Sequence, residues 1–414
     1  MQDPRLIRIS DYNYSLPEEK IARFPLEERD ASKLLISTAD NQLKSDIFSN
    51  ISDYLPENSL VILNNTRVVH ARILFKKASG ALIEVFCLEP YSPVNDIQLA
   101  FSQSSPVTWL CLIGNAKRWT SGLLELRQNI DGREVCLLVT KNERTNNDGS
   151  AKVTFEWQPQ EVTFSHIIDA FGCIPLPPYI KRKPDKEDSQ RYQTIFAKPE
   201  GSVAAPTAGL HFTQNVFKSL KNKHIDFEYL TLHVGSGTFK PVSSETIGDH
   251  LMHAEQLIIT SDLLEKISKG SYSSLVAVGT TSVRCLESLY WLGIQIINGR
   301  ELSLPFKIEQ WVPYHEQNSD LITVSESFNA IIKSMKKQDI VALIGFTNLI
   351  IAPPYKFRCI DILVTNFHQP KSTLLLLVSA FAGENWKNAY AYALQNNFRF
   401  LSYGDSCLFF TKRI

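Results

Sequence analysis

Apolar and polar positions alternate along one long segment of the chain. Between about residues 74 and 157, short alternating stretches are separated by Gly, Asn, Asp and Ser. A period of two is typical of half-buried antiparallel strands. The pattern therefore predicts a small β-barrel or sandwich, which we interpret as an inserted domain. Its stretches cover residues 81–88, 108–113, 122–126, 134–140 and 153–157.

On both sides of this segment the pattern changes to mixed α/β. Short apolar runs at residues 60–63 and 275–278 indicate buried strands, and residues 227–234 indicate another. Helices are predicted where periodic segments lie between capping residues and glycine. They cover residues 213–223, 261–270, 281–292 and 373–383. We therefore expect an α+β or mixed α/β catalytic domain formed by residues 1–73 and 158–414, interrupted by residues 74–157; the pattern of residues 294–349 predicts no defined element.

Composition and charge narrow the class of protein. The 414 residues include 43 basic and 43 acidic residues, so contact with nucleic acid requires a local basic patch. Seven scattered cysteines form no CxxC pair, which is typical of reduced thiols in the cytoplasm. The longest apolar run, residues 374–382, is interrupted by Ser379 and is too short to cross a bilayer. The sequence thus predicts a cytoplasmic protein without a membrane segment.

Two segments place small and hydroxyl residues at predicted helix starts. Residues 201–213 are dense in Gly and Ala, and residues 278–284 run from a buried strand through Gly279 into a Thr/Ser-rich turn. The first turn of a helix exposes N–H groups that suit a carboxylate or phosphate. Ordinary capping by Thr213 or Thr281 explains the same residues, so the pattern leaves both interpretations open.

Two loops carry further candidate residues. His233 leaves a predicted strand into a turn with Gly235 and Gly237, which does not complete the dinucleotide fingerprint and argues against a nicotinamide dehydrogenase. Asn366 and His368 lie in a loop just before an apolar helix. Polar residues in such loops are more often functional than polar residues in a core.

The segment that contains His250, His253 and Glu255 fits two kinds of site. Imidazole and carboxylate groups are ligands for zinc or iron. However, the spacing is not that of the zincin motif. We therefore favour a metal-free acid–base cluster, on the general use of His and Glu in proton transfer.

Nine stretches of the sequence form a series of motifs that follow one another along the chain. They are YSLPEEKIARFPLEERDASKLL (14–35), LNNTRVVHAR (63–72), PLPPYIKR (175–182), RYQTIFAK (191–198), GSVAAPTAGLHFT (201–213), TLHVGSGTFKPV (231–242), AVGTTSVRCLES (277–288), TNFHQPKSTLLLLVSAFAG (365–383) and FRFLSYGDS (398–406). In this order they resemble the signature blocks of the S-adenosylmethionine:tRNA ribosyltransferase-isomerase family of queuosine biosynthesis.

The resemblance implies a reaction and a fold. Members of the family transfer and isomerise the ribosyl part of S-adenosylmethionine onto the 7-aminomethyl-7-deazaguanine wobble base of tRNA. The product is epoxyqueuosine, and adenine and methionine leave. Their architecture is a partly barrel-like, mixed α/β main domain with a smaller inserted β-barrel. We therefore expect tRNA as partner, S-adenosylmethionine as co-substrate, no metal, and a monomer.

The resemblance also assigns candidate residues to each task. The proton transfers are assigned to His211, His233, His253, Glu255 and His368. Cofactor binding is assigned to Gly209, Gly235, Gly237, Thr280, Thr281, Ser282, Arg284 and Asn366. RNA binding is assigned to Tyr179, Lys181, Arg182, Lys183 and Arg191.

Some positions depart from the family pattern. Asn65 stands where Asp is usual, His70 where Pro is usual, Pro354 where Gly is usual, and Gln369 where Leu is usual. These departures suggest a divergent branch and leave three alternatives: a non-isomerising paralogue that binds S-adenosylmethionine and RNA, a methyltransferase, or a metallohydrolase.

Overall fold

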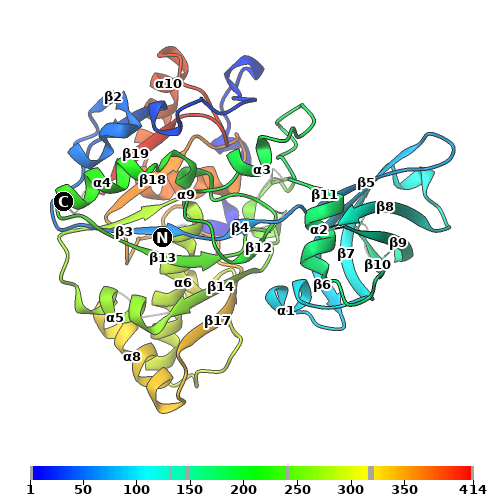
Figure 1. Cartoon of the computed structure of the whole chain (residues 1–414). Helices are drawn as coiled ribbons and strands as arrows, with labels where there is room; N and C mark the ends of the chain where they lie inside the picture. Colours follow the sequence, from blue (N-terminus) through cyan, green and yellow to red (C-terminus); the bar gives the residue numbers. More distant parts are fainter. Residues whose placement is uncertain are drawn as a thin grey trace.

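A ten-stranded mixed sheet runs through the centre of the molecule (Figure 1). The computed structural model describes residues 3–130, 132–144, 150–235, 237, 242–315 and 321–411. The strand order is β16-β17-β14-β13-β3-β15-β18-β19-β1-β2. The bounds are β1 (Lys33–Ser37), β2 (Leu43–Ile47), β3 (Leu60–Asn64), β13 (Asp226–Leu232), β14 (Glu255–Thr260), β15 (Leu275–Val278), β16 (Phe306–Ile308), β17 (Ala342–Thr347), β18 (Ile362–Asn366) and β19 (Ser406–Phe410).

Four neighbouring strands at the centre of this sheet, β13, β3, β15 and β18, run parallel. Strands β3, β15 and β18 are buried at every position. Strands covered on both faces have continuous apolar sequences, which is why β3 and β15 could be predicted as apolar runs. Because the four strands are parallel, their carboxyl ends meet at one edge of the sheet.

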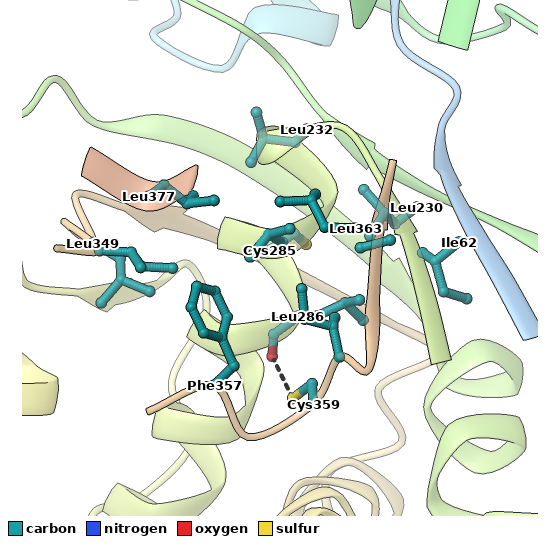
Figure 2. Close-up of a cluster of buried hydrophobic side chains, with 14 of the residues drawn as sticks. Ile62, Leu230, Leu232, Cys285, Leu286, Leu349, Phe357, Cys359, Leu363 and Leu377 are labelled. Carbon is teal, nitrogen blue, oxygen red and sulfur yellow. Dashed lines mark hydrogen bonds between the residues drawn. The ribbon is translucent and has the colours of Figure 1, made fainter. Parts of the chain in front are cut away.

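Helices cover both faces of the ten-stranded sheet. One core packs α5 (Ser261–Lys269), α6 (Thr280–Ile297), α8 (Val324–Lys337), α9 (Thr373–Ala382) and α10 (Asn385–Gln395) against one face. On the other face, α4 (Gln214–Asn222) and η5 (Phe48–Asp53) pack against Val61, Leu63 and Val276. Figure 2 shows Cys285 and Leu286 of α6 among Ile62, Leu230 and Leu363. The mixed α/β class predicted from the sequence is confirmed.

The predicted end of α6 at Gly293 is wrong. The helix continues through Gly293 to Ile297, and Gly293 is buried against α8. A Cβ atom at Gly293 would lie 2.0 Å from the Ser327 hydroxyl oxygen and 2.3 Å from the Ser327 carbonyl oxygen. The glycine therefore permits close helix–helix packing and does not cap the helix.

Residues 294–349, for which no element was predicted, contain much of the remaining secondary structure. Besides β16, β17 and α8 they include α7 (Val312–His315). A capping box starts α8, since the Thr323 hydroxyl accepts from the Glu326 backbone N–H and the Glu326 carboxylate accepts from the Thr323 backbone N–H.

A second, seven-stranded sheet lies to one side of the first (Figure 1, right). Its order is β11-β5-β6-β7-β10-β9-β8, and β8 contacts β5, so the sheet curls toward a barrel. It has a hydrophobic core of its own, which includes Trp109, Trp119 and Trp157. The bounds are β5 (Arg72–Lys76), β6 (Leu82–Ser92), β7 (Val107–Gly114), β8 (Leu124–Ile130), β9 (Arg133–Arg144), β10 (Ser150–Gln158) and β11 (Gly172–Cys173). That residues 74–157 form a separate inserted domain stays a prediction.

Short elements complete the described chain. The two strands β4 (Arg67–Val68) and β12 (Glu200–Ser202) pair in parallel. The remaining helices are α1 (Ile97–Phe101), α2 (Phe164–Phe171), α3 (Asp188–Arg191), η1 (Pro4–Leu6), η2 (Ile9–Tyr12), η3 (Glu18–Lys20), η4 (Arg29–Ala31), η6 (Ala116–Arg118), η7 (Thr207–His211) and η9 (Ile247–Asp249). Within the described ranges no helix has the length and apolar character needed to cross a membrane.

Candidate functional site

The polar segments identified in the sequence gather at the carboxyl edge of the four parallel strands. His233 follows β13, Asn65 follows β3, Gly279 follows β15, and Asn366 ends β18. The backbone N–H of Gly279 donates to the Val364 carbonyl at 2.7 Å, which ties the β15 and β18 ends together. Ligands of open α/β sheets bind at this edge.

A cleft opens to solvent at this edge, with about 670 Å³ of space between its walls when the open side is included. Its polar wall comes from five segments that are far apart in the sequence: the Tyr179 region, η7, the α6 start, the loop after β18, and the turn before β19. The polar lining residues are Tyr179, Thr207, Thr280, Thr281, Thr365, Asn366, His368, Gln369, Ser372 and Ser402.

The N-terminus of α6 faces into the cleft. Gly279 precedes the helix at φ +86°, a left-handed conformation that favours glycine. Thr281 lines the cleft, and its hydroxyl oxygen is buried without a hydrogen-bond partner in the described part of the chain. A buried orphan hydroxyl beside free helix N–H groups is suited to hold an anionic group of a ligand.

His368 is half-buried in the cleft wall. Its Nε2 lies 2.9 Å from the Thr365 hydroxyl, while its backbone N–H donates to the Tyr390 hydroxyl and its carbonyl accepts from Tyr14. Burial lowers the pKa of His368 to about 3, so the ring is neutral at pH 7. The Thr365 hydroxyl either donates to Nε2 or accepts from it, and Nδ1 carries the free lone pair only when Nε2 is the donor.

Behind the cleft, a buried chain of hydrogen bonds leads away from Asn366. The Asn366 amide oxygen accepts from the Thr207 hydroxyl at 2.7 Å, and its nitrogen donates to His211 Nε2 at 3.2 Å. His211 Nδ1 then donates to the Ser32 hydroxyl at 2.8 Å. Burial lowers the pKa of His211 to about 4, so this ring is also neutral. His211 therefore positions Asn366 and does not line the cleft itself.

His233 lies at the same sheet edge but is not part of the cleft lining. Its Nδ1 lies 2.9 Å from the Thr66 hydroxyl, and its Nε2 lies 3.3 Å from the amide nitrogen of Gln98 in α1. Only 3% of the residue is exposed, and burial lowers its pKa to about 4. His233 thus connects β13 to the first helix of the seven-stranded unit.

Glu255 and His253 differ sharply in environment. The buried Glu255 carboxylate forms an ion pair with the buried Arg284 guanidinium and accepts from the Gly235 backbone N–H at 3.3 Å. Arg284 also donates to the Leu349 carbonyl at 3.0 Å. His253 is exposed, with its ring against Gly237. The structure therefore does not bring these two side chains together, and neither lines the cleft.

Among the predicted cofactor-binding residues, Thr280, Thr281 and Asn366 line the cleft. The others lie elsewhere. The Ser282 hydroxyl donates to the carbonyl of Val278 at the end of β15, and Gly209 packs against Thr194. Gly235, Gly237 and Arg284 are not part of the cleft lining.

The predicted RNA-binding residues have different surroundings. Tyr179 lines the cleft, and its hydroxyl bonds Ser402 at 2.7 Å. Lys181 and Lys183 are exposed, and Lys181 pairs with Glu18. The structure also places Arg182 in a bidentate ion pair with the buried carboxylate of Asp188, at 2.6 and 2.7 Å. Arg191 donates to the carbonyls of Glu27 and Leu26.

Sequence reasoning missed Thr207, Ser402 and Ser372 in the cleft. Thr207 and Ser402 lie within blocks that carry the family resemblance, at positions where Pro and Gly neighbours indicate turns. Small hydroxyl residues in turns are usually capping or turn residues, so the signal was too weak to single them out.

Two of the residues that depart from the family pattern differ in their position relative to the cleft. Asn65 accepts from the Thr231 hydroxyl at 2.7 Å and is not part of the cleft lining, whereas Gln369 lines the cleft. In the described ranges, no group of three or more His, Cys, Asp or Glu gathers as metal ligands would.

Taken together, a helix N-terminus, neutral histidines and a cleft at the carboxyl edge of parallel strands define an α/β protein with a site for a polar small molecule. A family model described as a queuosine biosynthesis protein matches residues 9–409, and the chain belongs to this family.

Individual relatives span nearly the whole chain. An S-adenosylmethionine:tRNA ribosyltransferase-isomerase from Sulfurihydrogenibium sp. is 36% identical, covering 97% of this chain and 99% of its own. One from Treponema denticola is 35% identical, covering 96% and 98%. A crystal structure of S-adenosylmethionine tRNA ribosyltransferase from Thermotoga maritima is 28% identical, covers 97% of this chain and 100% of that chain, and has a TM-score of 0.44.

Proposed function

We propose that the protein is an S-adenosylmethionine:tRNA ribosyltransferase-isomerase of queuosine biosynthesis. It transfers and isomerises the ribosyl group of S-adenosylmethionine onto the 7-aminomethyl-7-deazaguanine wobble base of tRNA, giving epoxyqueuosine and releasing adenine and methionine. The observation that carries the proposal is one cleft in which the α6 N-terminus, the orphan Thr281 hydroxyl and the neutral ring of His368 meet.

The cleft residues fit S-adenosylmethionine. The N–H groups of the first α6 turn and the Thr281 hydroxyl would hold its carboxylate, and Asn366 offers an amide to its polar groups. When bound, its sulfonium group acidifies the neighbouring ribose C–H bonds. The buried Glu255–Arg284 ion pair would position the end of the cleft that is formed by Val234 and the start of α6. Glu255 accepts from the backbone N–H of the residue after Val234, and Arg284 lies on α6.

His368 is our first candidate for the base that removes a ribose proton. It lines the cleft, its ring is neutral at pH 7, and its Nε2 bonds the Thr365 hydroxyl. Because burial makes the ring a weak base, removal of a proton by His368 requires that the bound ligand raise its pKa. His253, Glu255, His211 and His233 are proposed to assist proton transfer or to position the groups that perform it. His211 does so through Asn366.

We also propose how the RNA is bound and how the chain is divided into domains. Tyr179 would stack the target base at the mouth of the cleft, and the loop with Lys181, Arg182 and Lys183 would follow the RNA backbone. Residues 74–157 would form an inserted β-barrel in a partly barrel-like main domain of residues 1–73 and 158–414. The enzyme would act as a monomer in the cytoplasm, without a metal.

Product analysis tests the reaction class directly. Incubation with S-adenosylmethionine and tRNA that carries the 7-aminomethyl-7-deazaguanine base should release adenine and methionine in equal amounts. S-adenosylhomocysteine would instead indicate a methyltransferase, and binding of both substrates without release of either product would indicate a non-isomerising paralogue. Activity that is lost on chelation would support the metallohydrolase alternative.

A further inference from the structure

A second pocket, lined by three arginines, lies directly behind the cleft. It is a shallow pocket open to solvent, with about 290 Å³ of space between its walls when the open side is included, and its polar lining includes Arg29, Arg191, Arg399, Ser32 and Ser402. We call it the arginine pocket. All three arginines are half-buried, so their charges are only partly screened by solvent.

The guanidinium groups of the pocket are held in place by backbone carbonyls. Arg29 donates to the carbonyls of Gln190 and Gln193, and Arg191 donates to those of Leu26 and Glu27. These reciprocal bonds fix the two side chains. A guanidinium has five N–H donors, so each of these arginines has donors left over.

The arginine pocket has more positive than negative charge. In the described part of the chain, neither Arg29 nor Arg191 pairs with a carboxylate, and Arg399 lies 3.7 Å from Asp405. Burial, and then the nearby Arg191, lower the pKa of Arg29, which fits two guanidinium groups close together without a carboxylate between them. Unpaired, partly buried arginines are costly unless an anion binds them.

The arginine pocket and the cleft share a wall. Thr207 and Ala208 of η7 line the cleft, whereas Leu210 and His211 of the same helix line the arginine pocket. Ser402 lines both cavities. An anion in the arginine pocket is therefore separated from a ligand in the cleft by the thickness of one segment.

We propose that the arginine pocket binds a phosphodiester group of the RNA substrate, next to the nucleotide whose base enters the cleft. The inference rests on the proposed function, since it names the part of the tRNA that this region recognises. Guanidinium groups form paired hydrogen bonds to phosphate oxygens, and a phosphate anchored here would position a neighbouring base at the cleft. The carboxylate of S-adenosylmethionine is the other anion that the reaction supplies, and the test separates the two.

The test compares Arg399→Gln and Arg191→Gln with a matched control. Arg300→Gln also removes one arginine that donates to a backbone carbonyl, that of Lys307, but Arg300 lies after α6 and away from both cavities. Each pocket variant should weaken tRNA binding about tenfold or more, as expected for loss of a hydrogen bond to a charged group. The salt dependence of tRNA binding should fall by the contribution of about one phosphate. Binding of S-adenosylmethionine should not change, and Arg300→Gln should behave like the unchanged protein.

A second measurement uses the unchanged protein, so it is decisive even if a variant fails to fold. Single phosphodiesters of an anticodon stem-loop RNA are replaced, one at a time, by neutral methylphosphonate. One position near the wobble nucleotide should weaken binding to the unchanged protein and have little further effect on Arg399→Gln. If no position weakens binding, or if the arginine variants weaken S-adenosylmethionine binding and leave tRNA binding unaltered, the inference is overturned. Failure of the unchanged protein to release adenine would count against the proposed function instead.

Discussion

At the scale of single residues, burial decides the charge state of the candidate site. His211, His233 and His368 each have a pKa well below the usual value because protein surrounds them and each has a hydroxyl partner that suits the neutral ring. A neutral imidazole has a free lone pair, but a pKa this low makes it a weak base until a bound ligand raises the pKa. Of the three, only His368 is among the residues that line the cleft, and we propose that the other two hold neighbouring segments in place.

We predict that His368→Asn lowers kcat by roughly 10²–10⁴-fold, in the range expected for loss of a general base. Binding of tRNA and of S-adenosylmethionine should change little. The measurement is single-turnover adenine release at saturating substrates. His224→Asn is the control, because His224 is exposed and is not part of the cleft lining.

His253→Ala and Glu255→Gln belong in the same series. The sequence blocks alone predict a loss of at least about 10²-fold for each. If those variants lose kcat while His368→Asn retains it, His368 is not the base.

The depressed pKa of His233 predicts a pH dependence of stability. The unfolded residue gains a proton near pH 6.5, whereas the folded residue gains one only near pH 4. Between these values the unfolded state binds more protons, so the stabilisation is present above pH 6.5 and is lost as the pH falls toward 4. This histidine therefore accounts for about 3 kcal/mol of the acid-induced decrease in the free energy of unfolding.

Urea unfolding at a series of pH values checks this prediction with His233→Gln. The variant should lose less stability than the unchanged protein between pH 7 and pH 4. His224→Gln, which changes an exposed histidine, should follow the unchanged protein. Parallel pH profiles for His233→Gln and the unchanged protein would contradict the assignment.

The sequence predicted some site residues and missed others for a physical reason. Asn366, His368 and Thr281 were found because polar residues directly follow apolar strands or precede apolar helices. The arginine pocket was not found, because its three arginines come from residues 29, 191 and 399 and meet only through tertiary structure. The ion pairs of Arg182 and Arg284 were missed for the same reason. Asp188 looks like an ordinary surface acid in the sequence, and Glu255 was predicted as a proton-transfer residue and not as the partner of Arg284.

At the scale of elements, the sequence pattern predicted the strands β3, β13 and β15 and the helices α4, α5, α6 and α9, but not β18 and not the contacts between elements. Gly293 resembled a helix end in the sequence, yet it is a packing position against Ser327 of α8. In residues 294–349 the capping box before α8 was a signal that sequence reasoning overlooked. The strands of this stretch are short, and β17 pairs with both β14 and β16. Pairing partners of this kind are distant in sequence and cannot be read from a local pattern.

The proposed inserted domain predicts a proteolysis pattern. Limited proteolysis should cut first near residues 76–80, where an exposed turn joins β5 and β6, or within residues 142–152. The fragments should stay associated under native conditions because the seven-stranded sheet has its own core. Mass spectrometry of the products locates the cuts. Cutting confined to residues 294–349, with residues 74–157 resistant, would contradict the prediction.

At the scale of the whole molecule, zero net charge means that RNA binding depends on local clusters. We propose two such clusters, the arginine pocket and the exposed Lys181 and Lys183. Arg182, between the two lysines, holds their loop through its ion pair with Asp188.

We predict that Lys181→Ala combined with Lys183→Ala weakens tRNA binding and reduces its salt dependence by about two phosphate contacts. S-adenosylmethionine binding and the thermal unfolding midpoint should not change, because both lysines are exposed. Lys336→Ala with Lys337→Ala at the end of α8 is the matched control. Filter binding across a salt series is the measurement. An unaltered affinity would mean that the two lysines contact solvent and do not contact tRNA.

The most direct test of the proposed function is nucleoside mass spectrometry of the tRNA product. Transfer RNA that carries 7-aminomethyl-7-deazaguanine at the wobble position is incubated with the protein and S-adenosylmethionine, digested to nucleosides, and compared with a reaction that contains His368→Asn. The unchanged protein should convert the 7-aminomethyl-7-deazaguanine nucleoside to epoxyqueuosine, and His368→Asn should do so far more slowly. Recovery of the starting nucleoside unchanged, or of a product that is heavier by one methyl group, would contradict the assignment of this chain as a ribosyltransferase-isomerase.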